Sequence, residues 1–107
     1  MPLDTSSFGA AIASARKELQ LSQKDVAGKI LKEDGLPISA PYLNDIEHSR
    51  RSPSSDHLVT QFATVLGISP NVLYLLAGRI PSDVARQNAS PEKIEKAFMA
   101  FRDELKK

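Results

Sequence analysis

Cysteine is absent from the 107 residues of this chain. Without it there are no disulfide bonds, no thiolate nucleophile and no cysteine-based zinc site. His48 and His57 are the only histidines, and no third metal ligand stands at helical spacing from them. We therefore expect neither a metal site nor a cofactor.

A surplus of either charge is also missing, because 14 lysines and arginines stand against 13 acidic residues, for a net charge of +1. Nucleic-acid binders draw their long-range attraction from surplus lysine and arginine, so this balance by itself counts against such a function. No apolar run approaches the roughly 18 residues of a membrane span. Residues 1–7 also lack the layout of a secretory signal. We expect a cytoplasmic protein that makes no membrane contact.

Catalytic motifs are missing as well. The chain has no nucleophile elbow, no glycine-rich phosphate loop and no Walker lysine motif. We therefore expect no enzymatic activity. A chain of this length, 41% hydrophobic, has room for one globular domain with a modest core and one appended element.

Helical periodicity is what the sequence does contain. Phe8, Ile12 and Ala15 recur at helical spacing and predict a first helix over residues 7–19. Five further helix starts each show a serine whose hydroxyl can cap the first turn. These serines are Ser22, Ser39, Ser54, Ser69 and Ser90. The second helix is expected to continue to about residue 32, with Gly35 as its terminator.

Runs of alternating β-branched residues are missing, so the predicted fold class is all-α. Five helices are expected in a domain of residues 1–78, followed over residues 79–107 by a linker and a C-terminal amphipathic helix. Residues 82–84 are compatible with one helical turn inside the linker. The last helix carries a narrow apolar stripe that needs a surface to cover, either the five-helix core or a second copy of the chain. The stripe contains Ile94, Ala97, Phe98, Phe101 and Leu105.

Residues 21–53 have the pattern of two helices joined by a turn. Ala27 is small enough for a close helix crossing, and five apolar residues are expected to face inward: Val26, Ile30, Ile38, Leu43 and Ile46. Four side chains of the third helix then point away from the core: Ala40, Pro41, Asn44 and Asp45. Arg50 and Arg51 follow in a turn, where guanidinium groups can hold phosphate oxygens.

Across residues 8–78 the sequence resembles the lambda-repressor and Cro-like helix-turn-helix family, including the xenobiotic-response-element type regulators. The resemblance rests on the order and spacing of short motifs in five elements. These are Arg16, Leu21-Ser22-Gln23, Val26-Ala27, Ile38-Ser39, Tyr42-Leu43, Ile46-Glu47, Arg51-Ser52-Pro53-Ser54 and Leu66-Gly67-Ile68-Ser69. It implies a five-helix DNA-binding domain whose third helix reads the major groove of double-stranded DNA.

The resemblance also implies individual roles. Base contacts fall on Ala40 and Pro41, which suit a thymine methyl, on Asn44, which suits adenine, and on Asp45, which suits a cytosine amino group. Contacts to the DNA backbone fall on Gln23, Ser39, Tyr42, Arg50 and Arg51. Gln23 is also expected to buttress the reading helix, and Glu47 is assigned to structure. On spacing alone, a solvated helix face is the favoured interpretation of Asn44 and Asp45, and the family resemblance reverses that preference. Tyr42, Arg50 and Arg51 are equally compatible with residues that pack or are solvated at the surface.

Two departures from the family pattern stand out. The connection over residues 31–37 is about six residues longer than the usual tight turn, and we expect the second helix to gain about a turn there. Ile38 and Ser39 should nevertheless keep their family positions. Ser49 replaces the glycine that commonly adopts a left-handed conformation after the reading helix, so this turn is expected to differ locally.

The sequence therefore predicts a sequence-specific DNA-binding regulator from a bacterium or phage, acting as a repressor. It is expected to bind as a homodimer that pairs through Ile94, Phe98 and Phe101 of the C-terminal helix. The alternative is a helical protein-interaction module, such as an antitoxin or the partner of another regulator. The near-neutral charge and the acidic Asp45 favour that alternative.

Overall fold

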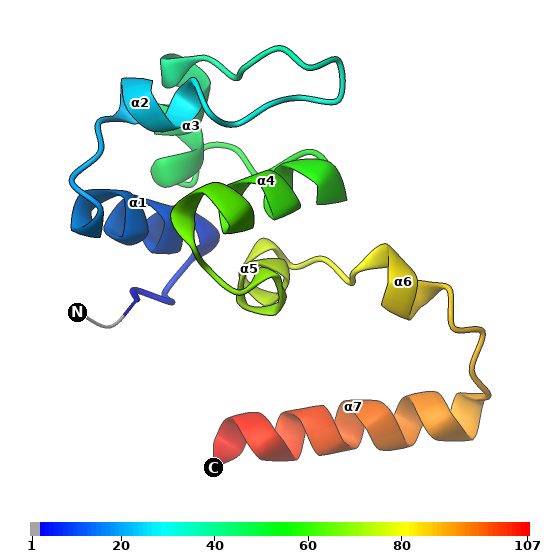
Figure 1. Ribbon diagram of the computed structural model, residues 1–107. Helices are drawn as coiled ribbons and strands as arrows, with labels where there is room; N and C mark the ends of the chain where they lie inside the picture. The colour runs from blue at the N-terminus through cyan, green and yellow to red at the C-terminus, as the bar shows by residue number, and fades with distance from the viewer. Residues whose placement is uncertain (1–2) are drawn as a thin grey trace.

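The computed structural model describes residues 3–107 as helices joined by loops (Figure 1). Met1 and Pro2, which begin the predicted domain 1–78, lie outside this range. Within it the helices are α1 (Phe8–Glu18), α2 (Gln23–Ala27), α3 (Ala40–Glu47), α4 (Asp56–Leu66), α5 (Pro70–Ala77), α6 (Ser82–Ala85) and α7 (Pro91–Lys106). The all-α prediction is confirmed, including five helices before residue 78 and one turn of helix at residues 82–85.

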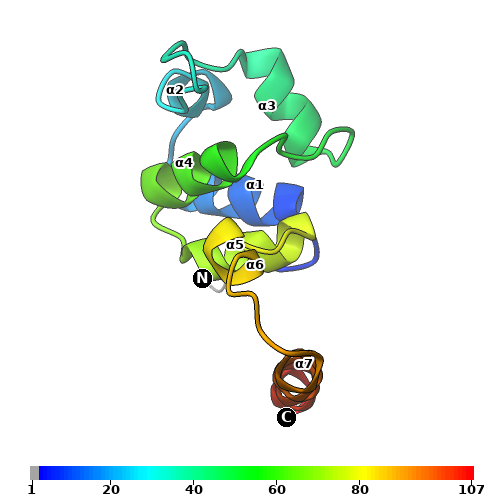
Figure 2. The same cartoon turned by 90° about the vertical axis from the view of Figure 1, so that its right-hand side faces the viewer.

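The core lies among α1 to α5, which pack as one bundle (Figures 1 and 2). Phe62 of α4 is fully buried at its centre, and its ring meets that of Phe8 edge to face at 5.7 Å between centroids. All five apolar residues predicted to face inward from residues 21–53 are buried. Since each large apolar side chain contributes about 1.5–3 kcal/mol on full burial, these contacts hold α2 and α3 on the bundle.

A glycine allows α1 and α3 to cross closely. A Cβ added at Gly9 would overlap the carbonyl oxygen of Ile46 and lie 2.6 Å from that of Glu47. Any side chain there would therefore push against the backbone of α3. Ala27, predicted to lie at a close helix crossing, is buried. The close crossing at Gly9 was not predicted. A glycine within a helical pattern is a local signal of such a crossing.

The α2–α3 connection differs from the prediction. Helix α2 ends at Ala27 and does not reach residue 32. Residues 31–37 form a small hairpin in which Leu31 and Pro37 make an antiparallel bridge and the N–H of Lys32 donates to the carbonyl of Leu36 at 2.8 Å. Gly35 is not a helix terminator, because it occupies the hairpin turn with φ +84°.

Two features explain why the chain leaves the helix here. Gly28, which follows the last residue of α2, has low helix propensity, and Gly35 supplies the positive φ that the hairpin turn needs. At the base of the hairpin the N–H of Ile38 donates to the carbonyl of Ile30 at 3.0 Å, and both side chains are buried. The extra residues are thus looped out, and Ile38 and Ser39 keep their expected positions.

Helix α4 fixes the hairpin in place. His57 Nε2 lies 2.8 Å from the carbonyl oxygen of Leu31, and Gln61 Oε1 accepts a hydrogen bond from the N–H of Leu31 at 3.0 Å. Ser55 Oγ donates to Glu33 Oε1 at 3.3 Å. In Figure 1 the hairpin accordingly projects over the start of α4. It is anchored by side chains that follow it by more than 20 residues in the sequence.

The predicted serine caps are confirmed at three of five positions, since Ser22, Ser39 and Ser90 each accept a backbone N–H of the first turn. Ser55 caps α4 in place of Ser54, because the helix starts one residue later than predicted, at Asp56. Ser69 precedes α5 but makes no side-chain cap bond, and Pro70 at the first helical position sets that start.

The C-terminal segment is anchored only at its beginning. Asp56 accepts hydrogen bonds from Arg79 Nε at 3.0 Å and from the N–H of Ser82 at 3.2 Å, which tie α6 to α4. The hydrogen bond from Arg79 is the main reason that the pKa of Asp56 is lowered. Helix α7 lies away from the bundle in both views, with all its residues exposed (Figures 1 and 2). No helix within residues 3–107 has both the length and the hydrophobicity needed to cross a membrane.

Candidate nucleic-acid interface

Helix α3 presents an outer ridge formed by Ala40, Pro41, Asn44 and Asp45. The helix starts at Ser39, whose Oγ accepts the N–H of Tyr42 at 3.1 Å, and Pro41 fits its first turn because it has no N–H to satisfy there. Successive side chains rotate by about 100° around a helix. Burial of Leu43 and Ile46 against the core therefore turns the ridge outward, where Pro41 is exposed and the other three residues are half-buried.

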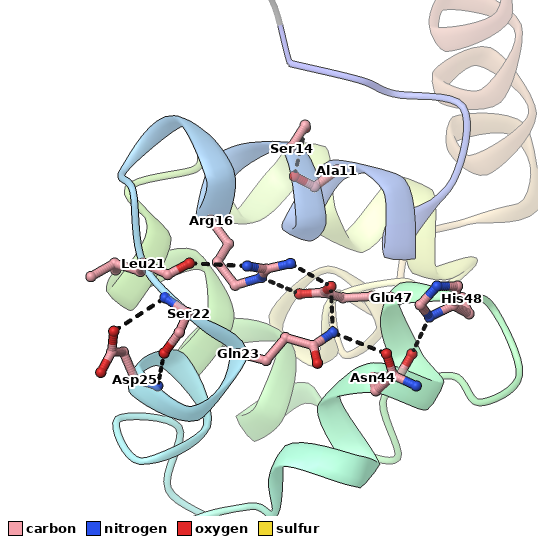
Figure 3. A network of polar contacts seen from close by, with 10 residues as sticks. All are labelled: Ala11, Ser14, Arg16, Leu21, Ser22, Gln23, Asp25, Asn44, Glu47 and His48. Carbon is pink, nitrogen blue, oxygen red and sulfur yellow. Dashed lines mark hydrogen bonds and ion pairs between the residues drawn. The ribbon is translucent and has the colours of Figure 1, made fainter.

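A buried ion pair braces the inner side of α3 (Figure 3). Arg16 of α1 binds Glu47 through two hydrogen bonds, from Nε to Oε2 at 2.7 Å and from the second guanidinium nitrogen to Oε1 at 3.0 Å. The two side chains are only 12% and 4% exposed. The remaining guanidinium nitrogen donates to the carbonyl of Leu21 at 2.9 Å. One arginine thus joins α1, the α1–α2 loop and α3.

The hydrogen bonds to Glu47 are the main cause that raises the pKa of Arg16, which keeps the guanidinium protonated. Such a pair specifies geometry more than it adds stability, because burying two charges costs nearly as much as their attraction returns. Its two-point contact sets how α3 is turned relative to α1. The structural role expected for Glu47 agrees with this placement.

Gln23 extends the brace to the outer ridge. Its Nε2 donates to Asn44 Oδ1 at 3.1 Å and to Glu47 Oε1 at 2.9 Å (Figure 3). Gln23 therefore braces α3, which agrees with the buttressing role expected for it, and it holds the Asn44 side chain in place. Both Nε2 hydrogens are used within the protein in this conformation. The expected phosphate contact of Gln23 stays a prediction and requires its amide to turn outward.

The Asp45 carboxylate forms an ion pair with Arg50. Arg50 Nε donates to Asp45 Oδ1 at 3.1 Å, and the backbone N–H of Arg50 donates to the Asp45 carbonyl at 2.8 Å. The turn that brings them together passes through Ser49 at φ +60°. The serine thus keeps the left-handed conformation of the family glycine, at a cost of about 1–2 kcal/mol. Pairing with Arg50 lessens the repulsion that a lone carboxylate would meet beside DNA.

Tyr42 and Arg51 form the flank of α3 that lies away from α2. The Arg51 guanidinium carbon lies 5.6 Å from the centre of the Tyr42 ring, which is a cation–π contact. The contact leaves the guanidinium N–H groups free to meet an anion. The structure thus brings together four of the five residues expected to contact the DNA backbone, Ser39, Tyr42, Arg50 and Arg51, around the ends of α3.

His48 is a further residue of the outer ridge, although the sequence suggested it only as a possible metal ligand. It caps the C-terminal end of α3, and its Nδ1 lies 2.8 Å from the carbonyl oxygen of Asn44 (Figure 3). The side chain is exposed, one helical turn beyond Asn44. That spacing of four residues was the available signal that it extends the outer ridge. No group of three metal-binding side chains occurs among residues 3–107.

Two comparisons with known proteins gave matches. A family model described as helix-turn-helix matches residues 12–73. Two curated proteins from two strains of Mycobacterium tuberculosis, CDC 1551 / Oshkosh and H37Rv, are each 34% identical over 79 residues, or 73% of this chain. Both are described as uncharacterized HTH-type transcriptional regulators. The matched segment spans about half the length of these relatives (51%). No solved structure matches the chain significantly.

Proposed function

The chain belongs to the helix-turn-helix family of DNA-binding transcriptional regulators, and we propose that it represses transcription by placing α3 in the major groove of operator DNA as a homodimer. The observation that carries this proposal is the outer ridge, which faces outward along one edge of α3 and is braced from behind. A rigid, preformed reading edge loses less entropy on binding than a mobile one.

The ridge has the chemistry of direct base readout. Ala40 and Pro41 offer apolar surface to a thymine methyl group, and the Asn44 amide keeps its Nδ2 donor for adenine. Asp45 accepts from a cytosine amino group while Arg50 compensates its charge. These side chains share one edge, so they meet successive base pairs along one groove.

Residues at the ends of the ridge fit the DNA backbone. A helix in the major groove, which is about 12 Å wide, has a phosphate strand on each side. Ser39, Tyr42 and Arg51 stand on one flank of α3, and Arg50 follows its C-terminal end. These hydroxyl and guanidinium groups supply the positioning contacts that set register without reading sequence.

Helix α7 supplies a surface for the second copy. Its stripe of Ile94, Phe98, Phe101 and Leu105 is 46–60% exposed. The intervals of four, three and four residues read the same in both directions. An antiparallel copy therefore matches the stripe layer by layer.

Charge complementarity favours the antiparallel arrangement. Glu95 and Arg102 stand two helical turns apart, on the same side of the stripe. In an antiparallel pair, Glu95 of one copy lies beside Arg102 of the other, twice by symmetry. In a parallel pair, Ser90 of one copy would lie beside Glu95 of the other, and Ala97 would lie beside Arg102, so neither charge would meet an opposite one. The α7 helices are therefore proposed to pair antiparallel.

Selection of bound duplexes from a random pool tests the function. The expected result is an enriched site with two-fold symmetry and half-sites about one helical turn apart. Affinity that stays near 10⁻⁴–10⁻⁶ M, roughly the non-specific range, for every duplex would contradict it. Stoichiometric capture of a protein partner without DNA selectivity would instead support an interaction module, which the net charge of +1 favours.

Asn44→Ala then tests the assigned reading edge. Discrimination at one base pair per half-site should fall by roughly 5- to 150-fold, while the other positions keep their preference. Thr64→Ala, at an exposed position of α4, is the control and should leave the selected site unchanged. An unchanged preference at every position in Asn44→Ala would remove α3 from the role of reading helix.

A further inference from the structure

A groove lies between the hairpin and α3. It is a hollow of about 470 Å³, open to solvent, and we call it the hairpin groove. The hairpin, the start of α3 and the turn before α4 all contribute to its walls. The polar residues among its lining are Lys32, Glu33, Ser39, Tyr42, Arg51 and Ser54.

The lining favours an anion. Lys32 and Arg51 bring two positive charges, and the hydroxyls of Ser39 and Tyr42 add donors. Among residues 3–107 neither cation forms an ion pair, whereas Arg16 and Arg50 each bind a carboxylate. The one acid of the lining, Glu33, accepts a hydrogen bond from Ser55.

The groove is placed where a phosphate strand of bound DNA would run. Around α3, Asn44 lies toward Gln23 and α2, whereas Tyr42 lies on the opposite flank, beside Arg51. The major groove has a sugar-phosphate strand on each side of an inserted helix. The strand on the Tyr42 side therefore passes the hairpin groove.

We propose that the hairpin groove holds a backbone phosphate of the operator between Lys32 and Arg51. This inference rests on the proposed function and adds to it a clamp formed by the looped-out residues 31–37. The clamp is preorganised, because His57 and Gln61 of α4 hold the residue before Lys32 at its backbone. Little ordering of the hairpin is then needed when DNA arrives.

The test compares Lys32→Gln with Lys107→Gln on the selected operator. Both variants remove one positive charge from an exposed lysine, and residue 107 lies at the far end of the chain from the hairpin (Figure 1). Lys32→Gln should weaken binding about tenfold or more for all sequences alike, and should reduce the slope of log K against log salt by about 1 for each subunit, or about 2 for the homodimer. Lys107→Gln should leave the slope unchanged. Equal slopes and affinities in the two variants would overturn the clamp.

Neutral methylphosphonate linkages, placed singly along the operator, locate the phosphate. One position on the strand beside Tyr42 should weaken binding of the wild type strongly and that of Lys32→Gln less, because only Arg51 then remains to contact this phosphate. Independent losses at every position would contradict a contact between Lys32 and the DNA backbone. Base preference should be the same in both proteins, since phosphate contacts carry no sequence information.

The outcomes separate the two proposals. A wild type that selects an operator, with no special effect of Lys32→Gln, refutes the clamp and leaves the proposed function standing. A wild type that binds no duplex refutes both. Inorganic phosphate at constant ionic strength tests the other source of the same anion. If it raises the Tm of the wild type but not of Lys32→Gln, while the two proteins bind the operator equally, a free phosphate is the occupant and the assignment to DNA is wrong.

Discussion

Removing Arg16 while Glu47 remains should destabilise the protein strongly. Arg16→Met deletes both hydrogen bonds to a carboxylate that is only 4% exposed, as well as the donor to the Leu21 carbonyl. Breaking one side of a buried pair costs about 3–5 kcal/mol, because the other charge is left unpaired. A domain of this size has about 5–15 kcal/mol of stability in total. At about 4–5 °C per kcal/mol, the expected loss in Tm is roughly 12–25 °C.

The double variant Arg16→Met/Glu47→Leu should recover most of this loss, since it removes both charges and leaves apolar side chains of similar size. We expect it within about 1.5 kcal/mol of the wild type. The remaining loss comes from Gln23, which loses one acceptor, and from the Leu21 carbonyl, which loses the Arg16 donor. Urea unfolding at pH 7, followed by far-UV circular dichroism, measures all four corners of the cycle. Glu104→Leu is the control for an exposed ion pair. It removes the contact between Glu104 and Lys107, whose side chains are both 73% exposed, and should lower the free energy of unfolding by less than about 1 kcal/mol.

Two results would refute the reasoning. If Arg16→Met costs less than about 1 kcal/mol, the Glu47 carboxylate is not desolvated as the structure indicates. If the double variant is as unstable as the sum of the two single variants, the pair has no coupling energy. The double variant also separates folding from function. A folded protein without Glu47 should bind its operator more weakly, because Gln23 then holds Asn44 with one contact fewer.

Two further predictions concern the α1–α3 crossing and α7. Gly9→Ala should destabilise the protein by about 2 kcal/mol or more in urea unfolding, because its Cβ meets backbone carbonyls such as that of Glu47. A Cβ added at Gly28 would make only ordinary van der Waals contacts, and the φ angle of this residue suits any amino acid. Gly28→Ala should therefore leave the stability unchanged or raise it slightly. In sedimentation experiments, Glu95→Arg or Arg102→Glu alone should weaken the dimer by roughly 5- to 30-fold, and the two together should restore it. A double variant as weak as either single one would argue against antiparallel pairing.

Short-range patterns in the sequence were enough to predict most of the helical framework. Spacing of Phe8, Ile12 and Ala15 placed α1, and serine caps placed α2, α3 and α7. These features involve residues within about four positions of one another, so a linear reading detects them. The outward direction of Asn44 follows in the same way, since burial of Leu43 and Ile46 sets the face of the helix.

Contacts between distant residues decided what the sequence left open. Residues 31–37 were compatible with an extra helical turn, but they form a hairpin that His57 and Gln61 bind from α4. Arg16 and Glu47 stand 31 residues apart, and only the crossing of α1 over α3 brings them together. Local propensity determined where most helices start. The hairpin groove and the brace behind the outer ridge of α3 exist only because packing places side chains from separate helices within hydrogen-bonding distance.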